Sequence, residues 1–157
     1  MKLSMKSFLF IVLFVNNSLL SFAQNDSIIK VPKFKPPAVK SYLGINTNGA
    51  AVTKEEAAQL ISLPLKVTDD KKNIYNITSY HFLYKRKGVI EDEATGKRSV
   101  TFTNLADFFK TSPLPKAWVD NLKDGFQKDE ELYFFDIIVT DNKNREFFAP
   151  DLKITIQ

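Results

Sequence analysis

Short stretches in which apolar and polar residues alternate dominate this chain, a pattern typical of β-strands with one wet face. Residues 152–156 show it most clearly, with Leu152, Ile154 and Ile156 separated by polar residues. Further strands are predicted over residues 65–68, 74–85, 97–103, 132–139 and 145–149, with turn-forming residues between them. The spacing predicts an all-β fold, a β-sandwich of the immunoglobulin type or similar, with two short helices.

Residues 132–139 are apolar at every position except Asp136, so we expect this strand to lie in the interior of the sheet. Strict alternation predicts one buried face, made of Tyr133, Phe135, Ile137 and Val139. Truncation of Phe135 to alanine is then expected to cost about 3–5 kcal/mol of stability.

Two segments carry helix signals. Thr53 and Glu56 form a capping box, in which the threonine hydroxyl accepts from a helical amide and the glutamate reaches back. A helix over residues 53–61 follows from it. A second helix, over residues 115–123, is predicted by Pro115 at its start and Gly125 just beyond its end.

The first 23 residues have the form of a secretory signal peptide. Lys2 and Lys6 precede an apolar run over residues 8–15, and the small residues Ser21 and Ala23 follow. We expect cleavage between Ala23 and Gln24. The alternative is an uncleaved anchor, which Asn16 and its neighbour make too short to span a membrane comfortably.

After the predicted cleavage site, residues 24–40 contain three prolines within six positions and are interpreted as an extended leader or linker. Residues 41–157 are expected to form one β-rich domain. The whole chain has 22 Lys and Arg against 18 Asp and Glu, and removing Lys2 and Lys6 lowers the net charge from +4 to +2. Lys85, Arg86 and Lys87 are interpreted as a solvated hairpin end, so nucleic-acid binding is not supported.

The composition excludes several chemistries. There is no cysteine and one histidine, so disulfides, thiolate metal sites and cysteine nucleophiles are absent, and no metal or cofactor is expected. His81 with Ser79 and Asp136 could in principle form a catalytic set, but no nucleophile motif surrounds them. We interpret His81 as an ordinary sheet residue and Asp136 as a bulge or edge residue. The acidic clusters at 91–93 and 129–131 lack the spacing of calcium loops and are interpreted as solvated turns.

Residues 43–157 resemble the C-terminal domain of the GldM/PorM-type proteins of gliding motility and type IX secretion. The similarity is a series of short motifs in the same order: a glycine pair and helix start over 44–54, an aliphatic-Thr-Ser-aromatic strand at 77–80, a helix end at 122–125, and strands at 132–139 and 148–156. Two features depart from the family pattern. Residues 126–131 separate the glycine from the next strand, and the turn at 141–144 has no glycine.

The resemblance implies an exported, non-enzymatic domain that binds another envelope protein, in the periplasm or alternatively outside the cell. It does not carry over the motor role of the family's membrane helix, and no stable membrane anchor is expected. The alternative is an exported carbohydrate-binding β-domain or small enzyme, which would need exposed aromatic rings clustered beside Asp, Asn or Arg. The oligomeric state is left open.

Partner binding by β-domains commonly uses an edge strand or an exposed aromatic patch. The C-terminal strand is the predicted edge, and the adjacent aromatic pair is the predicted patch. Each of the pairs 108–109 and 147–148 places one phenylalanine on each face of its strand. The predicted partner-binding residues are Phe147, Phe148, Leu152, Ile154 and Ile156.

Overall fold

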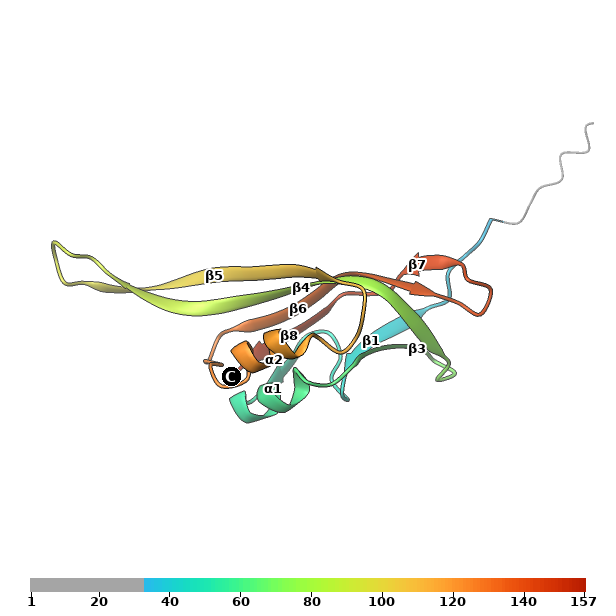
Figure 1. The fold of residues 1–157 in the computed structure, drawn as a ribbon, viewed down its shortest axis with the longest axis horizontal. Helices are drawn as coiled ribbons and strands as arrows, with labels where there is room; N and C mark the ends of the chain where they lie inside the picture. The colour runs from blue at the N-terminus through green and yellow to red at the C-terminus, as the bar shows by residue number, and fades with distance from the viewer. Residues whose placement is uncertain (1–32) are drawn as a thin grey trace, which may run out of the picture. The chain divides into compact units, whose positions relative to one another are not determined.

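A computed structural model describes residues 33–157 of the protein (Figure 1). The prediction of an all-β, sandwich-like fold with two short helices is confirmed. The predicted signal peptide and most of the predicted leader lie outside the described residues. The elements are β1 (Val39–Leu43), β2 (Ala50–Val52), α1 (Lys54–Leu60), β3 (Leu65–Asp69), β4 (Ile74–Glu91), β5 (Arg98–Phe109), α2 (Lys116–Leu122), β6 (Glu131–Thr140), β7 (Glu146–Phe148) and β8 (Leu152–Ile156).

The strands form a curled sheet organised around β4. The order is β1-β3-β4-β6-β8-β2, with β5 added to β4 and β7 added to β6. One edge of β4 pairs with β6, and the other pairs first with β3 and then with β5. The curl brings β1 beside the connection between β7 and β8, where the Ser41 hydroxyl donates to the carbonyl of Pro150. The core lies inside this curl.

Both predicted helices are present. Thr53 caps α1 with the reciprocal capping box expected from the sequence: the amide of Glu56 donates to the Thr53 hydroxyl, and the amide of Thr53 donates to the Glu56 carboxylate. Pro115 precedes α2, and the helix buries Leu122. Within the described part of the chain, neither helix is long and apolar enough to cross a membrane.

Two of the hairpin turns use the same side-chain device. The Asp69 carboxylate accepts from the amides two and four residues later, and the Asp141 carboxylate does the same. In each turn the third residue after the aspartate has a positive φ, 64° at Lys72 and 56° at Asn144. Asn144 therefore occupies a left-handed backbone conformation, which asparagine tolerates well without a glycine.

The predicted buried face of β6 is only half right. Ile137 and Val139 are buried, but so are Leu132 and Phe134, whereas Tyr133 and Phe135 are half-buried on the opposite face. The reason is a bulge at Asp136, whose φ is 48°. Asp136 adds a residue to β6, and an extra residue at Thr78 in β4 restores the original register. Because side chains alternate along a strand, the bulge exchanges the buried and exposed positions.

The basic cluster at residues 85–87 lies within β4 rather than at a hairpin end, so that interpretation was wrong. The β4–β5 turn comes later, where the Asp92 carboxylate accepts from the amides of Ala94 and Thr95. Lys85 pairs with Glu131 on β6, and the Lys87 ammonium lies 2.8 Å from the Asp129 carboxylate. The cluster is thus engaged within the fold.

The acidic cluster at 129–131 also differs from its interpretation as a solvated turn, because Glu130 is fully buried. Its carboxylate accepts from the amide of Lys87 at 2.8 Å, from the amide of Gln127 at 2.7 Å, and from the hydroxyl of Tyr84. The backbone carbonyl of Glu130 accepts from Ile156. This one residue therefore connects β4, β8 and the segment that follows α2.

Phe134 and Phe135 provide a matched test of the bulge. Phe134 packs against Phe82 at 4.9 Å between ring centroids and is buried, so Phe134→Ala should cost about 3–5 kcal/mol. Phe135 is half-buried, so Phe135→Ala should cost about half as much or less. Denaturant unfolding of both variants measures the difference. A larger cost at Phe135 would show that the bulge is placed wrongly.

Replacing Glu130 by glutamine tests the buried carboxylate. A glutamine amide has only one acceptor oxygen, so its NH₂ group would face one of the two backbone donors and leave that donor unsatisfied. We expect Glu130→Gln to lower the free energy of unfolding by about 2–3 kcal/mol. The control is Glu131→Gln at the neighbouring ion pair, which should cost below about 1 kcal/mol. Equal costs would contradict the proposed role.

Candidate functional site

The predicted partner-binding strand does not lie at an edge. β8 pairs with β6 on one side and with β2 on the other, and Leu152, Ile154 and Ile156 are all buried. The prediction of a free C-terminal edge was therefore wrong. The alternation along residues 152–156 indicates that one face of the strand is exposed to solvent. It does not indicate whether other strands pair with its two edges.

The two aromatic pairs divide as predicted, with one ring in and one out. Phe147 is buried and meets Tyr75 edge-to-face at 5.5 Å, whereas Phe148 is 68% exposed. Phe109 is buried beside Tyr80 at 5.7 Å, and Phe108 is exposed. Of the five predicted partner-binding residues, Phe148 is the one that reaches solvent.

The long edge of the sheet belongs to β5, which pairs only with β4 in the part of the chain that the structure describes. The hairpin closes at Asp92 and Lys97, where the Asp92 amide donates to the Lys97 carbonyl at 2.9 Å. In an antiparallel pair, every second residue of a strand exchanges hydrogen bonds with the partner strand. Counting from Lys97, the odd-numbered residues of β5 bond to β4, and the even-numbered residues do not. The backbone groups of Val100, Phe102 and Asn104 therefore face away from β4.

Two hydrogen bonds agree with this assignment. The amide of Lys87, which lies opposite Phe102, turns to Glu130 on the other side of β4. The amide of Phe108 is taken up by the adjacent Asp107 carboxylate at 2.8 Å. The stretch from Arg98 to Ala106 thus presents amides and carbonyls to solvent.

This edge lacks the usual protection against strand pairing. Natural edges are kept short, or carry lysine, proline or inward-pointing charges. Residues 99–106 contain no charged residue and no proline, and four of the eight are β-branched or aromatic on a strand of 12 residues. By comparison β1 has 5 residues and β2 has 3. The β5 edge is therefore open to pairing with another strand.

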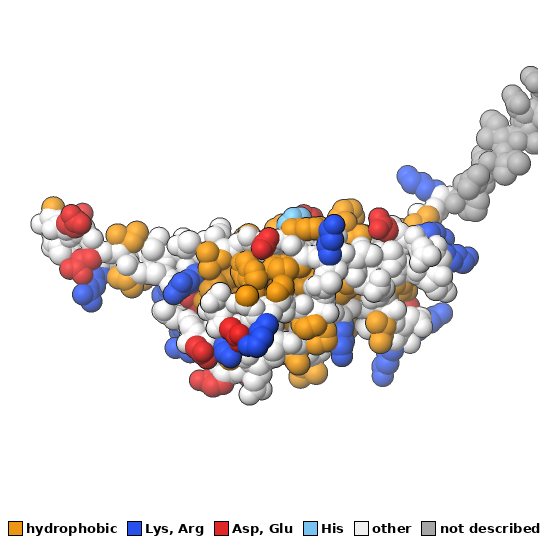
Figure 2. Space-filling model, viewed as in Figure 1, with side chains coloured by type: hydrophobic (Ala, Val, Ile, Leu, Met, Phe, Trp, Pro, Cys, Tyr) orange, Lys and Arg blue, Asp and Glu red, His pale blue; other side chains and the backbone are white. Residues whose placement is uncertain are grey.

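Apolar side chains accompany the edge. In Figure 2 hydrophobic side chains gather over the region between β5 and α2. Trp118 of α2 meets Phe82 and Phe109 edge-to-face, each at 5.7 Å, which places it at the margin of the core. The large apolar side chains exposed on the hairpin are Val89, Ile90, Val100, Phe102, Leu105 and Phe108.

A row of rings crosses the outer face of the sheet. His81 lies 5.1 Å from Phe108 and 5.1 Å from Phe135, and Phe135 stacks on Tyr133 at 5.0 Å. The Nδ1 atom of His81 is 3.6 Å from the Asp136 carboxylate, which exceeds a hydrogen bond, and within the described residues it has no hydrogen-bond partner. Ser79 is buried. The three residues do not form the geometry of a catalytic triad.

Polar groups beside this row are paired with one another. Glu131 lies between Lys85 at 3.4 Å and Lys153 at 2.9 Å, and the Tyr133 hydroxyl donates to Asp151. Burial raises the pKa of the Glu131 carboxyl group, but Lys153 and Lys85 outweigh it and hold the pKa below its usual value of 4.5. A sugar-binding face needs ring faces and polar groups that are available to the ligand. On the outer face these groups contact one another, so the β5 edge is the better candidate for a binding site.

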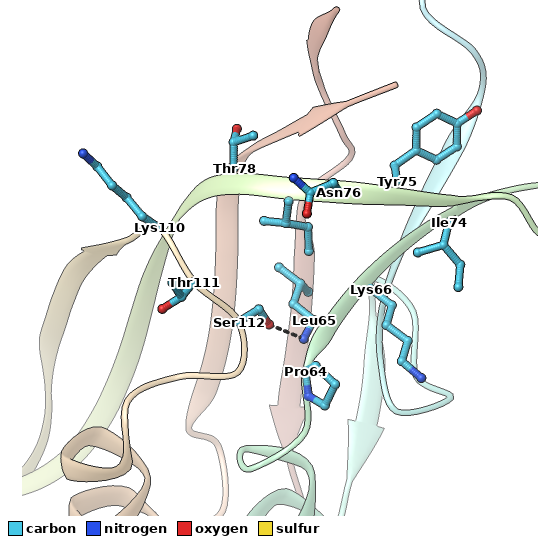
Figure 3. A pocket seen from close by; sticks show the side chains of 11 residues that line it. Pro64, Leu65, Lys66, Ile74, Tyr75, Asn76, Thr78, Lys110, Thr111 and Ser112 are labelled. Atoms are coloured by element: carbon cyan, nitrogen blue, oxygen red, sulfur yellow. Dashed lines mark hydrogen bonds between the residues drawn. The ribbon is translucent and has the colours of Figure 1, made fainter. Parts of the chain in front are cut away.

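A pocket lies at the fork where β3 and β5 leave the same edge of β4 (Figure 3). Residues from β3, β4 and the segment after β5 line it, and Ser112 accepts from the amide of Leu65 at 2.7 Å. Lys66 and Lys110 both line the pocket, but Figure 3 shows their side chains pointing in opposite directions. The pocket therefore has no converging charged groups for a catalytic or anion site.

Among residues 33–157 no group of three or more histidine, aspartate and glutamate side chains could hold a metal ion. No protein-family model matches the sequence, and no curated protein matches it. The resemblance described above therefore rests on its short motifs alone.

The β5 edge was missed because the predicted strand ended at residue 103, where Asn104 and Asp107 interrupt the apolar pattern. The signal present in the sequence was the absence of charge and proline over residues 99–106.

The ion pairs of Glu131 give a pH prediction. Because its pKa is lower in the folded state, the ion pairs add stability above pH 4.5, and this part is lost as the pH falls through the folded-state pKa. The free energy of unfolding of the protein should therefore fall more steeply below pH 4.5 than that of the Glu131→Gln variant. Denaturant unfolding at a series of pH values measures both, and parallel curves would contradict the prediction.

Proposed function

We propose that this chain is an exported, non-enzymatic interaction domain that binds a protein partner in the cell envelope through the free edge of β5. The supporting observation is the open edge itself, where the outward amides of Val100, Phe102 and Asn104 lie within the uncharged stretch 99–106. The resemblance to the GldM/PorM-type C-terminal domain supports the class of function. The signal-peptide pattern supports export to the periplasm.

Edge-strand addition suits this surface physically. An extended segment placed alongside β5 satisfies the outward backbone groups, which contribute affinity, while alternate side chains contribute specificity. Leu105 and Phe102 lie on opposite faces of β5 and are both exposed, so an added strand would gain apolar contacts on each face. The C-terminal strand has no part in this proposal, and Phe148 is separate from the β5 edge.

Asn104 offers a clean test because its amide faces outward and its side chain is exposed. Asn104→Pro removes this donor and places a ring at the edge, whereas Asn104→Ala keeps the donor. A photo-crosslinking amino acid at position 100 reports on the edge in the native envelope. We expect the adduct to persist with Asn104→Ala and to decrease at least about tenfold with Asn104→Pro.

Circular dichroism and thermal unfolding check that both variants are folded. An undiminished adduct in a folded Asn104→Pro protein would refute binding through the β5 edge. Saturable turnover of a small substrate that is lost on His81→Ala would refute the non-enzymatic class.

A further inference from the structure

We infer that the partner of the β5 edge is a second copy of this chain, and that two β5 strands pair antiparallel with Phe102 at the two-fold axis. This inference rests on the proposed function, because it uses the same edge. The result would be a continuous sheet in which β4 and β5 of one copy continue into β5 and β4 of the other.

Backbone direction limits the registers available. The residues of β5 whose backbone groups face outward have even numbers, so two copies can exchange hydrogen bonds only between even-numbered residues. With Phe102 opposite itself, Val100 lies opposite Asn104 and Arg98 lies opposite Ala106. A two-fold axis perpendicular to the sheet keeps each side chain on its own face, so the interface is self-complementary.

Charge selects this register from its neighbours. With Phe102 on the axis, Lys97 of each copy lies opposite Asp107 of the other, which gives two opposite-charge pairs on the same face. Both residues are exposed in the structure. A shift of two residues in either direction would set Lys97 opposite Leu105 or Phe109 and lose both pairs.

The apolar side chains of the hairpin are also exposed to solvent. β6 begins opposite Lys85, so beyond that point β4 and β5 pair only with each other. Val89 is 64% exposed, Val100 57% and Phe102 42%, all on one face of this two-stranded segment. A two-stranded hairpin is marginal by itself, and pairing with a second copy would make four strands of it.

Because the protein has no cysteine, one substitution introduces a single thiol for a register test. Phe102→Cys should form a disulfide-linked dimer under mild oxidation, since residues opposite each other in an antiparallel pair have Cα atoms about 5.5 Å apart. The control is Val89→Cys on β4, which is equally apolar and exposed but lies away from the axis, and which should stay monomeric on a non-reducing gel.

Sedimentation of the purified protein tests the charge pairs. We expect a dimer that dissociates on dilution, a dissociation constant raised about tenfold by Lys97→Glu, and recovery in the double variant Lys97→Glu with Asp107→Lys. Circular dichroism confirms that each variant is folded.

The outcomes separate the two proposals. A protein that is monomeric at every concentration, with no disulfide at Phe102→Cys, overturns the second-copy inference. If position 100 still crosslinks to a different protein in the native envelope, the proposed function survives that result. If position 100 gives no adduct, both are refuted. A disulfide formed by Val89→Cys in place of Phe102→Cys overturns the register.

Discussion

The buried carboxylate of Glu130 is the interaction on which the placement of the long hairpin depends. β4 leaves the main sheet where β6 begins, and the amide of Lys87 then points toward a neighbour that is no longer there. The Glu130 carboxylate accepts this amide in place of the missing strand, and it also accepts from Tyr84 and Gln127. A buried amide without an acceptor costs about 1–3 kcal/mol, so the hairpin could not leave the sheet at this position without such a group.

A second constraint lies at the other end of the same pair of strands. The bulge at Asp136 and the extra residue at Thr78 offset each other, so β4 and β6 have the same register on both sides of the irregularity. At the bulge the buried and exposed positions of β6 exchange, so Ile137 is buried while Phe135 and Tyr133 face outward with His81. The row of rings on the outer face is therefore a consequence of packing within the sheet, and its rings contact one another.

The parts of the fold that were predicted correctly are those that depend on neighbours in sequence. The Thr53 capping box, the aspartate-led turn at 141–144 and both helices are decided within five or six residues. Most of the failures depend on distant residues. The bulge expected at Asp136 is present, but its effect on which side chains are buried was not included in the predicted face of residues 132–139. A glutamate in an acidic cluster gives no sign that a distant amide needs it, and the C-terminal strand becomes interior only because β2 pairs with it in parallel.

The same reasoning explains why the open edge lies on β5. In the part of the chain that the structure describes, the outer strands β1 and β2 are short and belong to the curl that encloses the core, where added strands would compete with core packing. Beyond Lys87, β5 pairs with β4 alone, and its outward backbone groups form no ladder with another strand in the monomer. An edge that contributes little to the core is free to carry a sequence chosen for pairing. The absence of charge over residues 99–106, with Lys97 and Asp107 at its two ends, fits selection for one defined partner strand better than selection against association.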